Sequence, residues 1–169
     1  MKNSKAKKIA LYGMMVALAF AFSYLESLIP FNFGIPGVKL GLANIVVVVA
    51  LYTMKSGEAF TIAIFRIILA GLTFGNVYSL LYSLCGGILS FAIMYFVKKT
   101  KLSIIGVSML GGVCHNIGQL IVAAIVMQTA RIVYYIPVLL IAGLVTGFLM
   151  GLISKLVIDR LSKIEHINK

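Results

Sequence analysis

The chain has 169 residues, of which 62% are hydrophobic and 11% are charged, and its mean hydropathy is +1.10. A soluble domain of this length needs far more polar surface, so the composition indicates a membrane protein and leaves no room for a separate soluble catalytic domain. The formal net charge is +11, but the basic residues form short clusters between apolar runs, a pattern typical of membrane topology rather than of nucleic-acid binding.

Apolar runs between polar or turn-forming segments predict an all-α bundle of six transmembrane helices in one multi-pass domain, residues 1–169. We expect the helices at residues 9–28, 40–54, 59–74, 77–97, 102–130 and 137–157. A hydrocarbon core of ~30 Å requires ~20 helical residues, so the second and third helices are short. Short spans in membrane proteins often border a binding site.

The positions of lysine and arginine predict that both termini are cytoplasmic and that the protein lies in the cell membrane, surrounded by lipid. With the N-terminus inside, twelve basic residues fall in cytoplasmic segments, Lys39 and Arg131 fall in outer loops, and Arg66 is left within the membrane. A cleaved signal peptide is the alternative for the basic N-terminal segment. However, the apolar run continues past Ala21 without a polar cleavage region.

Two stripes of small residues repeat at intervals of about four, namely Gly13, Ala17 and Ala21 in the first helix and Gly143, Gly147 and Gly151 in the sixth. This spacing stacks small side chains on one helix face, where a second helix can approach closely. Each stripe is explained either by packing within the bundle or by docking of a partner membrane protein.

Arg66 lies in the middle of an apolar run, where an isolated cation costs roughly 2.5–3.5 kcal/mol on insertion scales. By depth, most other polar residues of the spans fall level with it or toward the outside. We expect a substrate site there, formed by Arg66, Lys39, Asn44, Asn76, His115, Asn116, Gln119 and Glu26.

An anion is the ligand class that this set favours, because Arg66 and Lys39 supply positive charge and arginine offers a planar fork for a phosphate or carboxylate. The alternative for Arg66 is a structural ion pair with Glu26. The alternative for His115 is an interhelical hydrogen bond. Lys39 can also be explained as a residue that extends to the membrane interface.

The sequence lacks the patterns of several other activities. The four acidic residues form no carboxylate pair or metal motif, and the cysteines Cys85 and Cys114 lie in apolar runs without metal-ligand spacing. There is no P-loop and no set of nucleophile, base and orienting residue. We therefore predict no catalytic residue, no metal site and no cofactor.

Three segments, GVKLGLANIVVVVALY (residues 37–52), FRIILAGLTFGNVYSLLYSLCGGILSF (residues 65–91) and GVSMLGGVCHNIGQL (residues 106–120), resemble the heptaprenyl diphosphate synthase component I family, also called the Gx transporter family. That family in turn resembles the six-helix substrate-binding S components of energy-coupling factor (ECF) transporters. Ala17 and Ala21 match the Ala-x-x-x-Ala docking motif that the first helix of S components often carries.

This resemblance implies two different functions. An S component captures a small molecule and acts with a transmembrane coupling protein and an ATPase pair. A synthase component assists prenyl chain elongation, although the chain lacks the Asp-rich motifs that hold magnesium in prenyl synthases, so it is expected not to be catalytic alone. The two implications are reconciled if the ligand is an isoprenoid or its diphosphate. A membrane scaffold without a ligand is the third interpretation.

Overall fold

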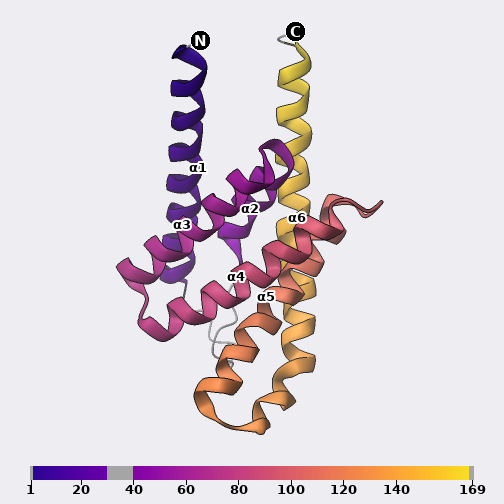
Figure 1. Cartoon of the computed structure of the whole chain (residues 1–169). Helices are drawn as coiled ribbons and strands as arrows, with labels where there is room; N and C mark the ends of the chain where they lie inside the picture. Colours follow the sequence, from indigo (N-terminus) through magenta and orange to yellow (C-terminus); the bar gives the residue numbers. More distant parts are fainter. Residues whose placement is uncertain (1, 30–39, 168–169) are drawn as a thin grey trace.

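The computed structural model describes residues 2–29 and 40–167, and these residues form an all-α bundle without a strand (Figure 1). The helices are α1 (Lys2–Leu28), α2 (Leu42–Thr53), α3 (Ser56–Phe74), α4 (Val77–Val97), α5 (Ile104–Met127) and α6 (Ile136–Ile167), and a 3-10 helix, η1 (Ala130–Tyr135), precedes α6. The first and last helices begin and finish at the same end of the bundle, here called the terminal end. The turns after α3 and α5 lie away from it.

The chain is a multi-pass membrane protein, because five of its described helices are long and apolar enough to cross a bilayer. The sixth, α2, has 12 residues and rises by only about 18 Å at 1.5 Å per residue. Its residues from Ile45 to Leu51 are all buried by the surrounding helices. The prediction of a six-helix membrane bundle is confirmed, and α2 is a short segment enclosed within it.

The predicted helix boundaries agree best where polar residues stop a helix. The fourth helix matches its predicted range of 77–97. The structure extends α1 to Lys2 and α6 to Ile167, beyond the predicted 9 and 157, because hydropathy detects only the apolar part of a helix. In the opposite sense, α5 ends at Met127 rather than at residue 130, since Gln128 adopts a left-handed conformation with φ of 48°.

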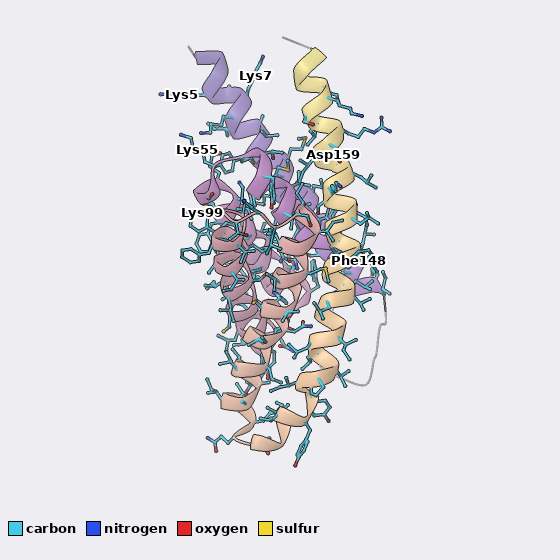
Figure 2. The ribbon with its side chains drawn as sticks, turned by 90° about the vertical axis from the view of Figure 1, so that its right-hand side faces the viewer. Lys5, Lys7, Lys55, Lys99, Phe148 and Asp159 are labelled. Carbon is cyan, nitrogen blue, oxygen red and sulfur yellow. The ribbon has the colours of Figure 1, made fainter. Side chains whose placement is uncertain are left out.

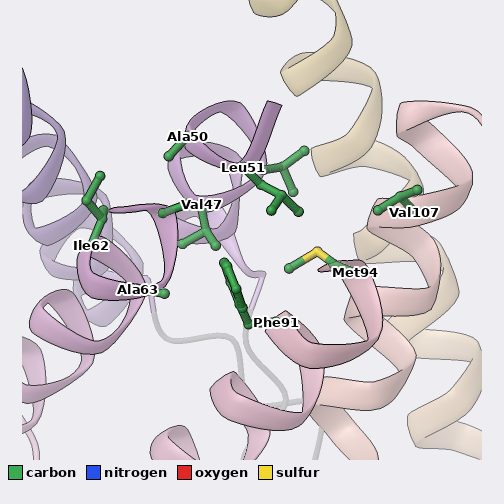
Figure 3. Packing of buried hydrophobic residues seen from close by; sticks show 10 residues of the cluster. Val47, Ala50, Leu51, Ile62, Ala63, Phe91, Met94 and Val107 are labelled. Carbon is green, nitrogen blue, oxygen red and sulfur yellow. The ribbon is translucent and has the colours of Figure 1, made fainter. Parts of the chain in front are cut away.

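An apolar core joins side chains of α2, α3, α4 and α5 (Figure 3). Leu51 of α2, Ile62 of α3 and Val107 of α5 are fully buried there, and Phe91 and Met94 of α4 pack between them. Between helices in a bilayer the attraction comes from close van der Waals packing of such side chains rather than from transfer out of water. The core therefore holds α2, α3, α4 and α5 together in close packing.

Glycines bring α5 and α6 into backbone contact. A Cβ added at Gly147 would lie 2.6 Å from the Cα of Met109, and one added at Gly143 would lie 2.9 Å from the backbone of Gly112. Real Cβ atoms do not approach backbone atoms this closely, so no larger side chain fits without moving a helix. The small-residue stripe of α6 is thus used for packing within the bundle.

Charged residues collect at the terminal end, where Lys5, Lys7, Lys55, Lys99 and Asp159 lie (Figure 2). An ion pair between Lys8 and Glu58 joins α1 to α3. The ammonium group of Lys98 donates a hydrogen bond to the carbonyl of Leu51 at 2.5 Å, near the end of α2. A cation at a helix C-terminus complements the helix dipole, although burial lowers the pKa of the Lys98 ammonium group.

Candidate functional site

A cavity of about 390 Å³ lies next to the apolar core on the side away from the terminal end. Small-molecule sites typically occupy roughly 300–1,000 Å³, so the cavity is large enough for a ligand. We call it the polar cavity, and its lining residues come from α1, α3, α4, α5, α6 and the start of α2: Ser23, Glu26, Ser27, Gly41, Asn44, Arg66, Ile67, Ala70, Gly71, Phe74, Gly75, Asn76, Ser79, Ser83, Gly112, His115, Asn116 and Thr146.

Arg66 lies in the wall of the polar cavity and is partly buried. Its Nη2 atom donates a hydrogen bond to Oδ1 of Asn44 at 2.8 Å, which joins α3 to α2. Its Nε atom is buried, and no described residue accepts a hydrogen bond from it. A buried donor of a charged group is costly to leave unsatisfied, so this atom is available to a ligand that enters the cavity.

Glu26, near the end of α1, lines the same cavity. Its Oε1 atom accepts a hydrogen bond from the backbone N–H of Gly41 at 2.5 Å. Gly41 precedes α2 with φ of 78°, a left-handed conformation that glycine adopts without steric cost. Glu26 also attracts Arg66 electrostatically. The carboxylate therefore stabilises both the start of α2 and the positive charge of Arg66.

The three predicted residues of α5 differ in their positions. His115 and Asn116 line the polar cavity, and Asn116 donates through Nδ2 to the carbonyl of Leu139 at 2.7 Å, which joins α5 to α6. Gln119 is buried beside the cavity lining, with its Nε2 atom 3.2 Å from Nε2 of His115. Gln119 is thus placed to orient the imidazole of His115 rather than to touch a molecule in the cavity.

Asn76 and two serines form a polar face on α4. Oδ1 of Asn76 accepts a hydrogen bond from the N–H of Ser79 at 2.8 Å and caps the helix. Ser79 and Ser83 follow at intervals of three and four residues, so all three side chains share one side of α4 and line the cavity. Sequence reasoning found Asn76 but not the serines, although their spacing within an apolar helix is a signal that could have found them.

The structure brings six of the eight predicted site residues to one cavity: Glu26, Asn44, Arg66, Asn76, His115 and Asn116. Gln119 lies next to it, and Lys39 lies outside the described residues. That these residues bind a substrate stays a prediction. These six residues come from five helices and line one cavity, and their depth along the predicted spans is what suggested that they lie near one another.

The small-residue stripe of α1 has a different environment from that of α6. Gly13, Ala17 and Ala21 are exposed on the outside of the bundle, and a Cβ added at Gly13 would meet no atom within 4 Å. The buried side of α1 instead carries Ala19 and Ser23. Packing within this chain therefore does not explain the stripe of α1.

Comparison with known proteins identifies one family. The family model described as "Heptaprenyl diphosphate synthase component I" matches residues 15–157, which include every described lining residue of the polar cavity. No curated protein and no solved structure matches the chain. The chain belongs to the heptaprenyl diphosphate synthase component I family.

Proposed function

We propose that this protein is the substrate-binding integral membrane subunit of an ECF-type transporter and that it binds an anionic small molecule in the polar cavity. The observation that carries the proposal is the position of Arg66, a charged residue within a membrane helix whose buried Nε–H faces no acceptor among the described residues. Ionisable residues within membrane spans commonly mark the paths of substrates and ions.

The orientation follows from charge. Lys5, Lys7, Lys55 and Lys99 lie at the terminal end, and the positive-inside rule assigns this end to the cytoplasm of a cell membrane (Figure 2). The polar cavity then lies on the outer side of the apolar core. In this state a molecule from outside can reach Arg66, while the core separates it from the cytoplasm.

The partners would be a transmembrane coupling protein and an ATPase pair. The exposed stripe of Gly13, Ala17 and Ala21 supports this assignment, because small residues on a lipid-facing surface allow a second helix to approach closely. Large apolar residues such as Met14 and Leu18 flank the stripe and are exposed as well. The face therefore combines a row of small residues with exposed apolar neighbours, which suits packing against another membrane helix.

Co-purification tests the proposal. The chain is expressed in its native membrane with an affinity tag, and the coupling protein and ATPase pair are identified in the purified complex. Ala17→Leu and Ala21→Leu should abolish the complex, whereas Ala17→Ser and Ala21→Ser, which keep the side chains small, should retain it. If the leucine variants keep the complex, the α1 stripe is not the docking face, and if no ATPase pair is ever recovered, the transporter assignment fails.

The family description supports a second candidate, a noncatalytic membrane component of a heptaprenyl diphosphate synthase system. Among the described residues there is no group of three or more His, Cys, Asp or Glu side chains that could hold a metal ion. A role in prenyl elongation would thus depend on a separate catalytic subunit. A stable complex with a soluble prenyl transferase, and a changed product length on adding this chain, would favour this candidate over the transporter.

A further inference from the structure

The polar cavity is bordered by hydroxyl groups from two facing helices. Ser23 and Ser27 come from α1, and Ser79 and Ser83 come from α4. The hydroxyls of Ser23 and Ser27 donate to carbonyls of their own helix, at 3.0 Å and 2.7 Å, so their oxygens keep the capacity to accept a hydrogen bond. The cavity wall therefore offers several acceptors to a ligand that carries hydroxyl or N–H groups.

The charge of the cavity wall suits a single negative group. Of the lining residues that the structure describes, Arg66 is the one lysine or arginine, and Glu26 contributes a carboxylate to the same wall. A phosphate monoester alone carries roughly −1.5 to −2 charges at neutral pH, and a diphosphate carries more. With Arg66 and Glu26 both charged, a carboxylate ligand leaves one negative charge in excess among these residues, whereas a diphosphate leaves two or more, so the smaller charge is favoured.

The size of the cavity limits the ligand further. A volume of about 390 Å³ lies near the lower end of the roughly 300–1,000 Å³ that small-molecule sites occupy. On the terminal side the cavity meets the apolar core, where Leu51, Ile62 and Val107 are fully buried, and a small adjoining space of about 20 Å³ reaches Val48, Met94 and Met150. A long prenyl tail could extend in that direction only by displacing these side chains, and close-packed interiors resist such insertion.

We propose that the ligand of the polar cavity is a compact hydroxylated monoanion rather than a prenyl diphosphate. Its negative group binds the guanidinium of Arg66 together with the side-chain amide of Asn44. Its hydroxyl groups bind the serine side chains of α1 and α4. This inference rests on the proposed function for the identity of the site, and it adds the chemical class of the molecule bound there.

Binding to the purified full-length chain in detergent tests the inference, with calorimetry as the measurement. The probes are two hydroxylated monocarboxylates, gluconate and mevalonate, and two compounds of the opposing class, inorganic pyrophosphate and geranyl diphosphate. At least one monocarboxylate should bind. Arg66→Ala should weaken its affinity by at least about tenfold, and Ser83→Ala by about three- to tenfold, as expected for the loss of one hydrogen bond.

Thr73→Val is the matched control, because this substitution also removes one hydroxyl, but from an exposed residue of α3 that does not line the cavity. It should leave the affinity unchanged. The inference is overturned if geranyl diphosphate or pyrophosphate binds while both monocarboxylates do not, if no probe binds, or if Ser83→Ala and Thr73→Val have equal effects. None of these results affects the complex with an ATPase pair, so a failure here is distinguishable from a failure of the proposed function.

Discussion

Arg66 of α3 and Asn44 of α2 are joined by a hydrogen bond of 2.8 Å in the wall of the polar cavity. The acceptor is a neutral amide, so the pair positions the guanidinium without neutralising its charge. An aspartate at position 44 would position the guanidinium and also neutralise its charge. This difference in charge between two side chains of nearly equal shape makes position 44 a sensitive place to test what Arg66 is for.

Asn44→Asp should therefore weaken anion binding while preserving the fold. The new carboxylate would form an ion pair with Arg66 and compete with any incoming anion, lowering its affinity by at least about tenfold, or roughly 1.4 kcal/mol or more. The thermal unfolding midpoint of the ligand-free protein should stay the same or rise, since a buried charge gains a partner. Unchanged anion affinity in a folded Asn44→Asp protein would show that Arg66 does not bind the ligand.

A double-mutant comparison separates ligand binding from a structural ion pair between Arg66 and Glu26. If Arg66 serves a ligand, Arg66→Gln abolishes binding, and adding Glu26→Gln does not restore it. If the two residues act mainly as a pair, each single variant destabilises the protein and the double variant recovers stability, because no buried charge is left alone. Thermal unfolding and calorimetry on all four proteins distinguish these outcomes.

Gly147→Ala should destabilise the bundle, whereas Gly13→Ala should not. The new Cβ at Gly147 would lie 2.6 Å from the Cα of Met109, and forcing α5 and α6 apart should cost about 1–3 kcal/mol. At Gly13 the same change meets open space and replaces glycine by a better helix former. The two thermal midpoints in detergent, compared with that of the unchanged chain, check this expectation.

Cysteine labelling tests the orientation. In a background with Cys85 and Cys114 replaced by alanine, Lys55→Cys and Tyr134→Cys place single thiols at opposite ends of the bundle, and both positions are exposed. A membrane-impermeant maleimide added to intact cells should label Tyr134→Cys and leave Lys55→Cys unlabelled until the cells are opened. The reverse pattern would place the polar cavity on the cytoplasmic side.

The sequence predicted the fold and much of the cavity because both depend on signals that are strong in a membrane protein. A charge such as Arg66 is conspicuous in an apolar run, and the depth of Asn44 and Asn76 along their spans brought them to the correct level. The small-residue pattern could not distinguish the α1 stripe from the α6 stripe, since both have the same spacing. Only tertiary structure shows that a Cβ added at Gly147 would clash with Met109, while one added at Gly13 would meet open space.

The serines were missed for a related reason. In helices, serine commonly bonds to a carbonyl of its own preceding turn, as Ser23 does with Ala19, so a serine in an apolar span is a weak signal by itself. Ser79 and Ser83 are informative only once residues of α1, α3 and α4 are seen to line one cavity. The sequence also did not predict how far α1 and α6 extend beyond their apolar runs. Hydropathy identifies only the apolar part of a helix and gives no signal for its polar ends.

The apolar core also determines where a membrane voltage would act on this protein. Val47, Val48 and Leu51 of α2 belong to the apolar core, which separates the polar cavity from the terminal end. An electric potential falls mainly across a layer of low dielectric constant and little across a polar space that is connected to solvent. A monoanion that stops at Arg66 would therefore have crossed a small part of the field. Moving one charge across the whole membrane potential changes its free energy by roughly 2.3 kcal/mol for each 100 mV, and most of this change would accompany the onward passage of the anion through the core.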